Sequence, residues 1–109
     1  MPPIPQRVVL QVLRVLQEAL NNALKHAQAS LIRIDAVWRE ADQTIAIRVA
    51  DDGVGLAEPL RRGRGLNNMQ RRAREVGANL TIDHPTGGTE LRFLLKYGAW
   101  RETYPDLAR

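Results

Sequence analysis

A change in the spacing of apolar residues near residue 30 constrains this chain more than any other feature. Over residues 6–27, apolar side chains recur every three or four positions with no glycine or proline between them, which predicts one long amphipathic helix. Residues 31–38 and 44–50 alternate apolar and polar side chains instead, which predicts an antiparallel hairpin of two strands. This succession favours a layered fold in which helices cover a sheet.

The second half of the chain repeats this order. Helical spacing returns over residues 66–76 and ends at Gly77, and residues 79–84 and 89–96 alternate as strands around a turn. We therefore predict an α+β fold, an α/β sandwich with helices packed on one face of a mixed, mainly antiparallel sheet. Residues 8–96 form the predicted domain, residues 1–7 extend it, and residues 97–109 are a tail without a clear pattern.

Composition narrows the class of protein. A chain of 109 residues, 44% hydrophobic and 26% charged, is one domain with a core and is not a disordered segment. It has no cysteine, which excludes a disulfide framework, a thiolate metal site and a thiol nucleophile. Because no apolar run reaches about 20 residues and no signal peptide begins the chain, we expect a soluble chain, and its lack of cysteine is compatible with a cytoplasmic location.

The net charge of +4 comes from one arginine cluster. Six arginines fall within residues 61–74, a stretch without any acid, and removing them would leave a net charge of −2. They are Arg61, Arg62, Arg64, Arg71, Arg72 and Arg74. A solvated helix face and a surface near phosphate explain the cluster equally well. Aromatic residues are not interleaved with it, so nucleic-acid binding by base stacking is poorly supported.

Three short motifs carry the chemistry, and the first lies at the end of the long helix. Glu18, Asn22 and His26 are spaced by four and share one helix face. The amide oxygen of Asn22 can ligate Mg²⁺, which prefers oxygen donors, and Lys25 could meet a phosphate. Taken alone, the motif is more simply explained as a hydrated polar helix face.

The second motif, Asp51-Asp52-Gly53-Val54-Gly55, directly follows an apolar strand. Strand alternation places Asp51 on the side that the helices cover, where a carboxylate needs a hydrogen-bond donor. The exocyclic amine of adenine is such a donor, whereas guanine presents an acceptor there. Thr89 begins the last strand with a parity that turns it toward the same side. A tight Asp-Gly turn without a ligand explains the second motif about as well.

The third motif is the stretch Gly63-Arg64-Gly65-Leu66 at the start of the second helix. Free backbone N–H groups and the positive end of the helix dipole favour a phosphate at such a place. The stretch is neither a Walker loop nor a dinucleotide fingerprint, because the required lysine and the parallel strand are absent from the pattern.

Together the three motifs closely resemble the ATP-binding catalytic domain of sensor histidine kinases, within the gyrase, Hsp90, histidine kinase and MutL superfamily. Residues 17–27 look like the asparagine box, and residues 51–55 and 63–69 look like two glycine boxes. The sequences of these motifs are most similar to those of the nitrate/nitrite-sensor branch, whose members phosphorylate response regulators. The resemblance covers roughly residues 8–96.

The resemblance implies a Bergerat-type fold that holds ATP and Mg²⁺ between helices and sheet under a lid. By matching positions, Asn22 would ligate Mg²⁺, Lys25 would assist the phosphates, Asp51 would bind the adenine amine and Thr89 would support Asp51, commonly through water. Glu18 would stand where ATP-hydrolysing relatives keep a general base. The glycine boxes would supply further nucleotide contacts through Gly53, Gly55, Gly63, Gly65 and Leu66.

Two departures qualify the match. The lid segment is short, and no dimerisation hairpin with an acceptor histidine precedes Gln6. We therefore expect the catalytic part of a longer sensor, monomeric in isolation, that phosphorylates a histidine on a separate dimerisation domain and serves a response regulator indirectly, without direct nucleic-acid contact. The alternatives are an anti-sigma-factor-like serine kinase of the same fold and, from another class, a basic nucleic-acid-binding module.

Overall fold

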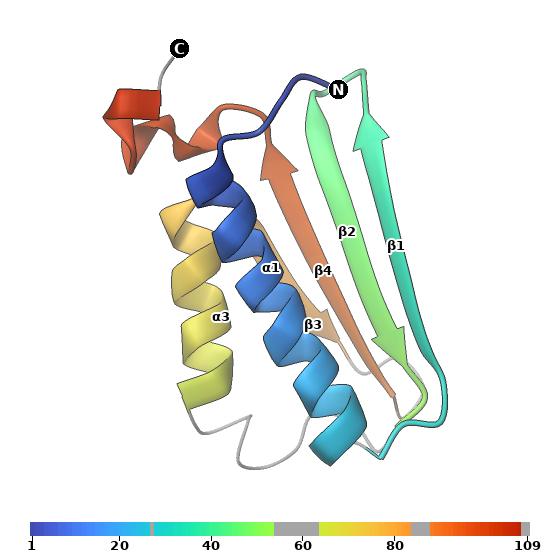
Figure 1. Ribbon diagram of the computed structural model, residues 1–109. Helices are drawn as coiled ribbons and strands as arrows, with labels where there is room; N and C mark the ends of the chain where they lie inside the picture. Colours follow the sequence, from blue (N-terminus) through green and yellow to red (C-terminus); the bar gives the residue numbers. More distant parts are fainter. Residues whose placement is uncertain (27, 54–63, 84–87, 108–109) are drawn as a thin grey trace.

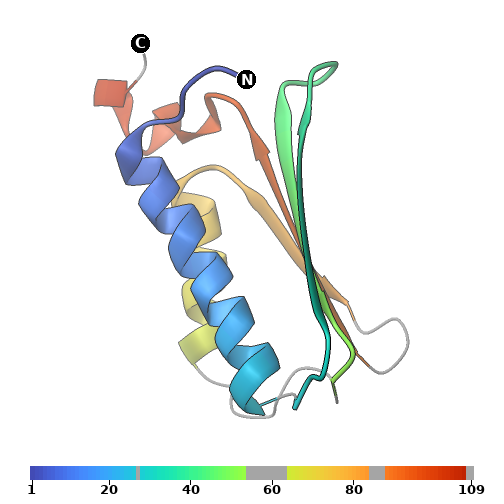
Figure 2. The ribbon, with the colours of Figure 1, turned by 45° about the vertical axis from the view of Figure 1, so that its right-hand side comes forward.

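Two helices lie side by side over one face of a four-stranded sheet (Figures 1 and 2). The computed structural model describes residues 1–26, 28–53, 64–83 and 88–107. Its elements are, in chain order, α1 (Gln6–Asn21), the π-helical turn η1 (Asn22–His26), β1 (Ile32–Arg39), β2 (Thr44–Asp51), α3 (Arg64–Glu75), β3 (Asn79–Asp83), β4 (Thr89–Lys96) and the short 3₁₀ helices η2 (Ala99–Glu102) and η3 (Pro105–Leu107). The predicted α+β sandwich is confirmed.

The strands of the sheet run in the order β1-β2-β4-β3. Both predicted hairpins are present, and β2 pairs with β4 between them, with Ile47 opposite Phe93. Every strand pairing in the described part of the chain is antiparallel. Strand β4 therefore lies at the centre of the fold, where both of its neighbours and both helices can pack on it.

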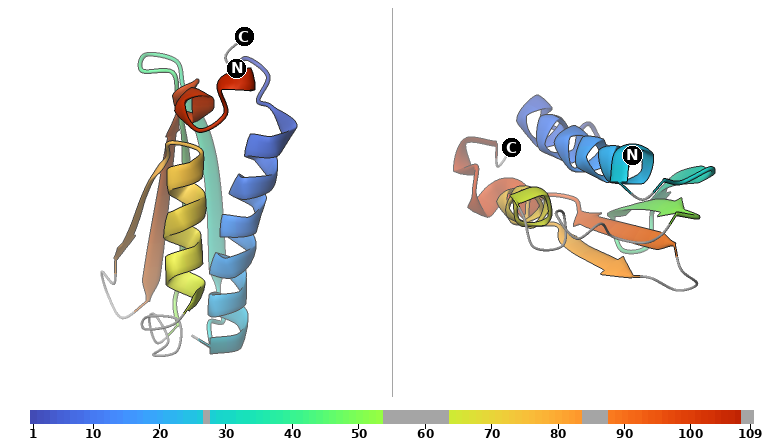
Figure 3. Two further views of the ribbon diagram at one scale, coloured as in Figure 1. Left: turned by 90° about the vertical axis from the view of Figure 1, so that its left-hand side faces the viewer. Right: turned by 90° about the horizontal axis from the view of Figure 1, so that it is seen from below.

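The core fills the space between the two helices and the inner face of the sheet, which Figure 3 shows along the helix axes. Its largest fully buried side chains come from α1, from α3 and the residue that follows it, from β4 and from η2: Val8, Val15, Met69, Val76, Phe93, Leu95 and Trp100. Because Val8 and Val15 lie two helical turns apart and Phe93 and Leu95 are alternate strand residues, the predicted periodicities account for much of the core.

Helix α1 differs from its predicted length. The α-helix ends at Asn21, and the chain continues through the wider turn η1 as far as His26. The N–H of Ala29 donates to the carbonyl of Ala23 at 3.0 Å, and Gln28 has a left-handed φ of 54°. Single π-helical turns of this kind are frequent at functional sites, and this one carries Asn22.

Helix α3 ends in a glycine motif that the sequence predicts. Gly77 has φ 75°, its N–H donates to the carbonyl of Arg74 at 3.0 Å, and the N–H of Ala78 donates to the carbonyl of Ala73 at 2.8 Å. This pair of bonds is the Schellman arrangement. A Cβ on Gly77 would also overlap the backbone of Ala99, so glycine lets η2 pack against the helix end.

The segment after Lys96, predicted to be a tail without pattern, is folded. Trp100 in η2 is only 1% exposed, and its ring meets the ring of Tyr97 edge to face, with centroids 4.9 Å apart. The guanidinium of Arg7 lies over the ring of Tyr104 and also pairs with Asp106 at 2.8 Å. These contacts cover the N-terminal end of α1. Single anchoring residues give no periodic pattern in the sequence, so the pattern did not predict this folded segment.

The strand predicted over residues 31–38 is present as β1, but the prediction that it is half-buried is wrong. By register Ile34 and Ala36 face the same side as Val49 and Ile47, which is the side of the helices. Nevertheless β1 lies at the sheet edge beyond their cover, and Ile34 is 50% exposed. Within the described residues, no helix is long and apolar enough to cross a membrane.

Candidate functional site

A small polar cavity lies at the end of α1, between the helices and the sheet. Its lining residues come from α1, η1, α3 and the strands β2, β3 and β4: Ala19, Asn22, Val49, Asp51, Met69, Ile82, Thr89 and Leu91. The cavity measures about 10 Å³, which is close to the minimum for one water molecule. We call it the polar cavity. It brings together Asn22, Asp51 and Thr89, three of the residues that the sequence singled out.

Asn22 reaches the polar cavity because η1 begins there. Its side chain is 3% exposed and lies one turn beyond Ala19, on the buried stripe of α1. A polar amide is unusual on such a stripe, because an uncompensated amide away from water costs free energy. Asn22 thus brings a polar amide to the ends of β2 and β4.

Asp51 and Thr89 face each other across the β2–β4 pairing. One carboxylate oxygen of Asp51, Oδ1, accepts the N–H of Gly53 at 2.8 Å. The hydroxyl of Thr89 is buried, and within the described part of the chain it has no hydrogen-bond partner. Since buried polar atoms are nearly always bonded, this hydroxyl indicates a place for a water or ligand atom.

Gly88 is a site residue that sequence reasoning missed. It is buried, and a Cβ at this position would overlap the carbonyl oxygen of Asp51. Only glycine therefore lets the start of β4 approach the end of β2 closely enough for Thr89 to face Asp51. The pair Gly87-Gly88 before a strand was the signal in the sequence, although it does not say which strand the glycine approaches.

The carboxylate of Asp52 is held in its charged form. A hydrogen bond from the Ser30 side chain lowers its pKa most, and bonds from the backbone of Leu31 and Ser30 act in the same direction, whereas desolvation opposes them. On the outer sheet face, hydrogen bonds from Arg48 and then Arg92 lower the pKa of Glu90 in the same way. Neither Asp52 nor Glu90 lines the polar cavity.

The remaining predicted site residues lie around the polar cavity or outside the described residues. Glu18 is half-buried on α1, one turn before Asn22, and does not line the cavity. The backbones of Lys25 and His26 belong to η1, and Gly65 and Leu66 belong to the first turn of α3, where Leu66 packs against the core. Gly53 follows β2 directly. The predictions for Gly55 and Gly63 lie outside the described residues.

The arginine cluster is partly structural. Arg72 donates to the side-chain oxygen of Gln11 at 2.9 Å, and the amide of Gln11 donates in turn to Glu75 at 2.7 Å, so these residues tie α3 to α1. Arg71 and Arg74 are exposed on the outer side of α3. Arg61 and Arg62 lie outside the described residues. Within the described part, the cluster is a helix face rather than a continuous basic surface.

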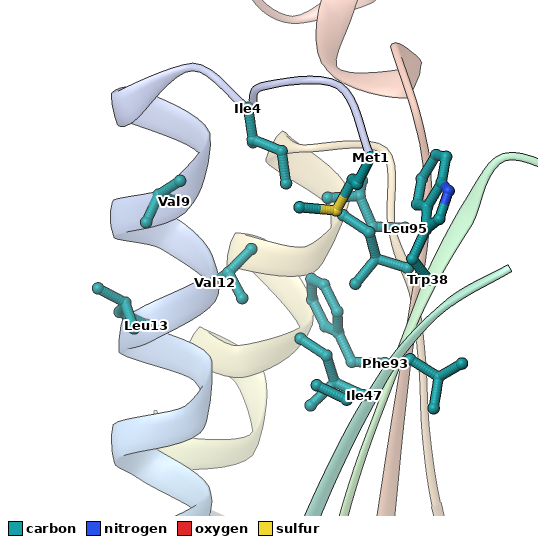
Figure 4. A pocket seen from close by; sticks show the side chains of 12 residues that line it. Met1, Ile4, Val9, Val12, Leu13, Trp38, Ile47, Phe93 and Leu95 are labelled. Atoms are coloured by element: carbon teal, nitrogen blue, oxygen red, sulfur yellow. The ribbon is translucent and has the colours of Figure 1, made fainter. Parts of the chain in front are cut away.

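A much larger hollow opens at the other end of α1. It measures about 400 Å³ and is shown in Figure 4. Its lining is apolar throughout, with Val12 and Leu13 from α1 opposite Trp38, Ile47 and other side chains of the sheet. We call it the apolar groove. Since it offers no charged group to a phosphate, volume alone does not identify the functional site.

Comparison with known proteins identifies the family of this chain. The family model described as histidine kinase-, DNA gyrase B- and HSP90-like ATPase matches residues 8–99. The chain belongs to this family and is an ATP-binding domain, and its predicted resemblance to sensor histidine kinases is confirmed by its relatives.

These relatives are sensor proteins. The chain is 40% identical over 85 residues to the nitrate/nitrite sensor protein NarQ of Escherichia coli, covering 75% of this chain and 15% of that protein. It is 41% identical over 98 residues to a NarQ homolog of Haemophilus influenzae, covering 85% and 17%. For the sensor protein VraS of Staphylococcus aureus the identity is 31% over 91 residues, covering 81% and 26%. The chain thus spans about a quarter or less of these relatives.

A solved structure supports the fold. The histidine kinase domain of the Erythrobacter litoralis EL346 blue-light activated kinase superposes with a TM-score of 0.80 at 20% identity, over 94% of this chain and 51% of that one. Neither the relatives nor the solved structure supports the anti-sigma-factor-like kinase or the nucleic-acid-binding module.

Proposed function

We propose that this chain is the catalytic domain of a two-component sensor histidine kinase. It binds Mg²⁺-ATP and donates the γ-phosphoryl group to a histidine on a separate dimerisation domain, from which a response regulator receives it. The location we propose is cytoplasmic, where ATP and a response regulator are available. One observation carries the proposal: in the domain of an ATPase family, the buried hydroxyl of Thr89 lies opposite Asp51 and has no hydrogen-bond partner among the described residues.

The adenine selectivity follows from the donor and acceptor pattern at the strand ends. Because Gly53 occupies one oxygen of Asp51, the other can accept the adenine amine, and a guanine carbonyl at the same place would repel it. A water between Thr89 and the base would satisfy the threonine hydroxyl, and the polar cavity has room for one such water. The present cavity is too small for a purine, so we place the base at its mouth.

Magnesium fits a site built around one protein ligand. Among the described residues, no three acidic or histidine side chains gather to hold a metal ion. Mg²⁺ at nucleotide sites takes one or two protein oxygens and completes its shell with phosphates and waters, so the amide oxygen of Asn22 suits it. When bound, the ion would neutralise phosphate charge. We place Glu18 and Lys25 beside the phosphates, on the same helical wall as Asn22.

A phosphotransfer experiment tests this function. Phosphoryl transfer needs an acceptor in line with the γ-phosphate, and His26 stands on the same helical segment as Asn22 rather than on a separate hairpin. We expect γ-labelled ATP to leave this chain unlabelled and to label a separately prepared histidine-bearing domain from its parent kinase with an acid-labile phosphate. Stoichiometric label on His26 or His84 would contradict a separate acceptor domain, and absence of ATP binding would contradict the function itself.

A further inference from the structure

The residue after β2, Asp52, holds the start of β1 through several hydrogen bonds. Its Oδ1 accepts the backbone N–H groups of Ser30 and Leu31, both at 2.9 Å, and its Oδ2 accepts the hydroxyl of Ser30 at 2.5 Å. The N–H of Asp52 donates to the carbonyl of Leu31 at 3.3 Å. We call this set of bonds the Asp52 clamp. It extends the β1–β2 ladder beyond its last residue pair, Ile32 and Asp51.

Asp52 does not itself touch the proposed adenine position. Successive strand residues point to opposite faces, so Asp51 turns toward the polar cavity and Asp52 turns away from it. Asp52 is exposed and is absent from the cavity lining. Any effect of Asp52 on nucleotide binding must therefore act through the backbone that it shares with Asp51.

The clamp joins the two walls of the nucleotide site. One wall is η1 with Asn22, and the chain leaves this turn to reach Ser30 only four residues after His26. The other wall is the end of β2 with Asp51. Strand ends fray unless their backbone is tied down, and here three charge-assisted bonds tie the end of β2 to Ser30 and Leu31, which follow η1 in the chain.

The aim of the Asp51 carboxylate depends on the same backbone. Its Oδ1 accepts the N–H of Gly53, so residues on both sides of Asp52 fix the carboxylate direction. A shift of residues 51–53 would turn Oδ2 away from the direction that Thr89 and the polar cavity define. Binding sites are often preorganised in this way, by hydrogen bonds from neighbouring residues that do not themselves contact the ligand.

We propose that Asp52 is a positioning residue for nucleotide binding: by clamping Ser30 and Leu31 it fixes the end of β2 against the connection from η1 and so aims Asp51 at the adenine amine. This inference rests on the proposed function. Asp52 would thus affect ATP affinity although its exposed carboxylate does not contact the nucleotide. The lowered pKa of Asp52 agrees with a clamp that is charged at neutral pH.

Calorimetric titration with Mg²⁺-ATP on purified variants tests the proposal. We expect Asp52→Ala to weaken ATP affinity about tenfold, the order expected when a displaced site residue loses one hydrogen bond. Asp52→Asn should recover part of this loss, because its amide oxygen can still accept the N–H groups of Ser30 and Leu31. The matched control is Asp42→Ala, which removes an exposed aspartate paired with Arg39 at the opposite end of the same hairpin and should leave ATP affinity unchanged.

A second readout separates positioning from general stability. Hydrogen exchange of the Gly53 amide, which reports its bond to Asp51, should quicken in Asp52→Ala without nucleotide and stay at the wild-type rate in Asp42→Ala. Wild-type ATP affinity in folded Asp52→Ala would overturn the proposal. If that variant does not fold, Ser30→Ala decides: weakened affinity with faster Gly53 exchange supports the clamp, and unchanged affinity overturns it.

The experiment also distinguishes the two levels of inference. If wild-type protein binds ATP and Asp51→Asn does not, while Asp52→Ala binds like wild type, only the clamp fails. If wild-type protein itself does not bind ATP, the proposed function fails first.

Discussion

Two hollows lie along the same helix and above the same sheet, and they differ in almost every physical property. The apolar groove at the N-terminal half of α1 has about 400 Å³ and an apolar lining, whereas the polar cavity at the other end has about 10 Å³. The small one contains Asn22, Asp51 and Thr89. Only there does the described structure leave a buried hydroxyl without a partner beside a carboxylate.

The difference indicates that a buried polar atom without a hydrogen-bond partner is a better sign of a nucleotide site than the volume of a hollow. An apolar hollow can bind any apolar surface of the right shape, and so it selects little. The half-buried carboxylate of Asp51 beside the buried hydroxyl of Thr89 accepts a donor in one direction and rejects an acceptor there, and this property suits the proposed choice of adenine over guanine.

The largest expected effect comes from exchanging one atom of the polar cavity. In Asp51→Asn an amide can present a donor to the adenine amine, so we expect ATP affinity to fall by about 1.5–3 kcal/mol, the usual strength of a hydrogen bond to a charged group. Calorimetric titration with ATP and GTP measures the loss. The fold should survive, as seen in an unchanged circular dichroism spectrum.

The matched control lies in the apolar groove. Ile45→Val should lower the free energy of unfolding by about 0.5–1 kcal/mol through lost packing and leave ATP affinity unchanged. Unaltered ATP binding in a folded Asp51→Asn protein, or strong loss of ATP binding in Ile45→Val, would contradict the claim that the polar cavity, and not the apolar groove, supports ATP binding.

A smaller, conditional effect is expected at Asn22. Asn22→Ala removes the proposed oxygen ligand, so the gain in nucleotide affinity that Mg²⁺ provides should shrink, while affinity measured with chelator changes little. Titrations with Mg²⁺ and with chelator, on wild type and variant, give the comparison. Equal responses to chelation in both proteins would make Asn22 a structural amide only.

The smallest effect concerns pH. The pKa values of Asp52 and Glu90 are lowered in the folded chain, so their stabilising bonds are complete above the ordinary carboxyl values of 3.8 and 4.5 and are lost as pH falls below them. Denaturant unfolding between pH 3 and pH 7 should therefore show stability declining only at the acid end. Because Asp52 is exposed to water, which screens its bonds, its share of the decline is modest.

Variants of these two acids sharpen the comparison. Asp52→Asn and Glu90→Gln should each flatten the acid decline, whereas Ile45→Val should shift the whole curve without changing its slope, since no titratable side chain lines the apolar groove. An unchanged acid slope in the two carboxylate variants would show that other groups carry it.

Much of the fold was predictable because its signals are local. The period of apolar residues gave the helices and strands to within a few positions, Gly77 marked the end of α3, and strand parity placed Asp51 and Thr89 on one face. The three motifs also predicted the family. Other features had no local signal: Trp100 anchors an irregular segment with one side chain, and η1 replaces the last turns of a helix whose sequence pattern continues unbroken.

By itself, the sequence determined the type of each element, the face each buries and the polar groups available for chemistry, because these depend on neighbours three or four positions apart. Only the tertiary structure decided that β4 lies beside β2. That pairing brings Thr89 opposite Asp51, gives Gly88 its close approach and leaves β1 as an uncovered edge. Such contacts join residues about forty positions apart, and their selection depends on how the whole core packs.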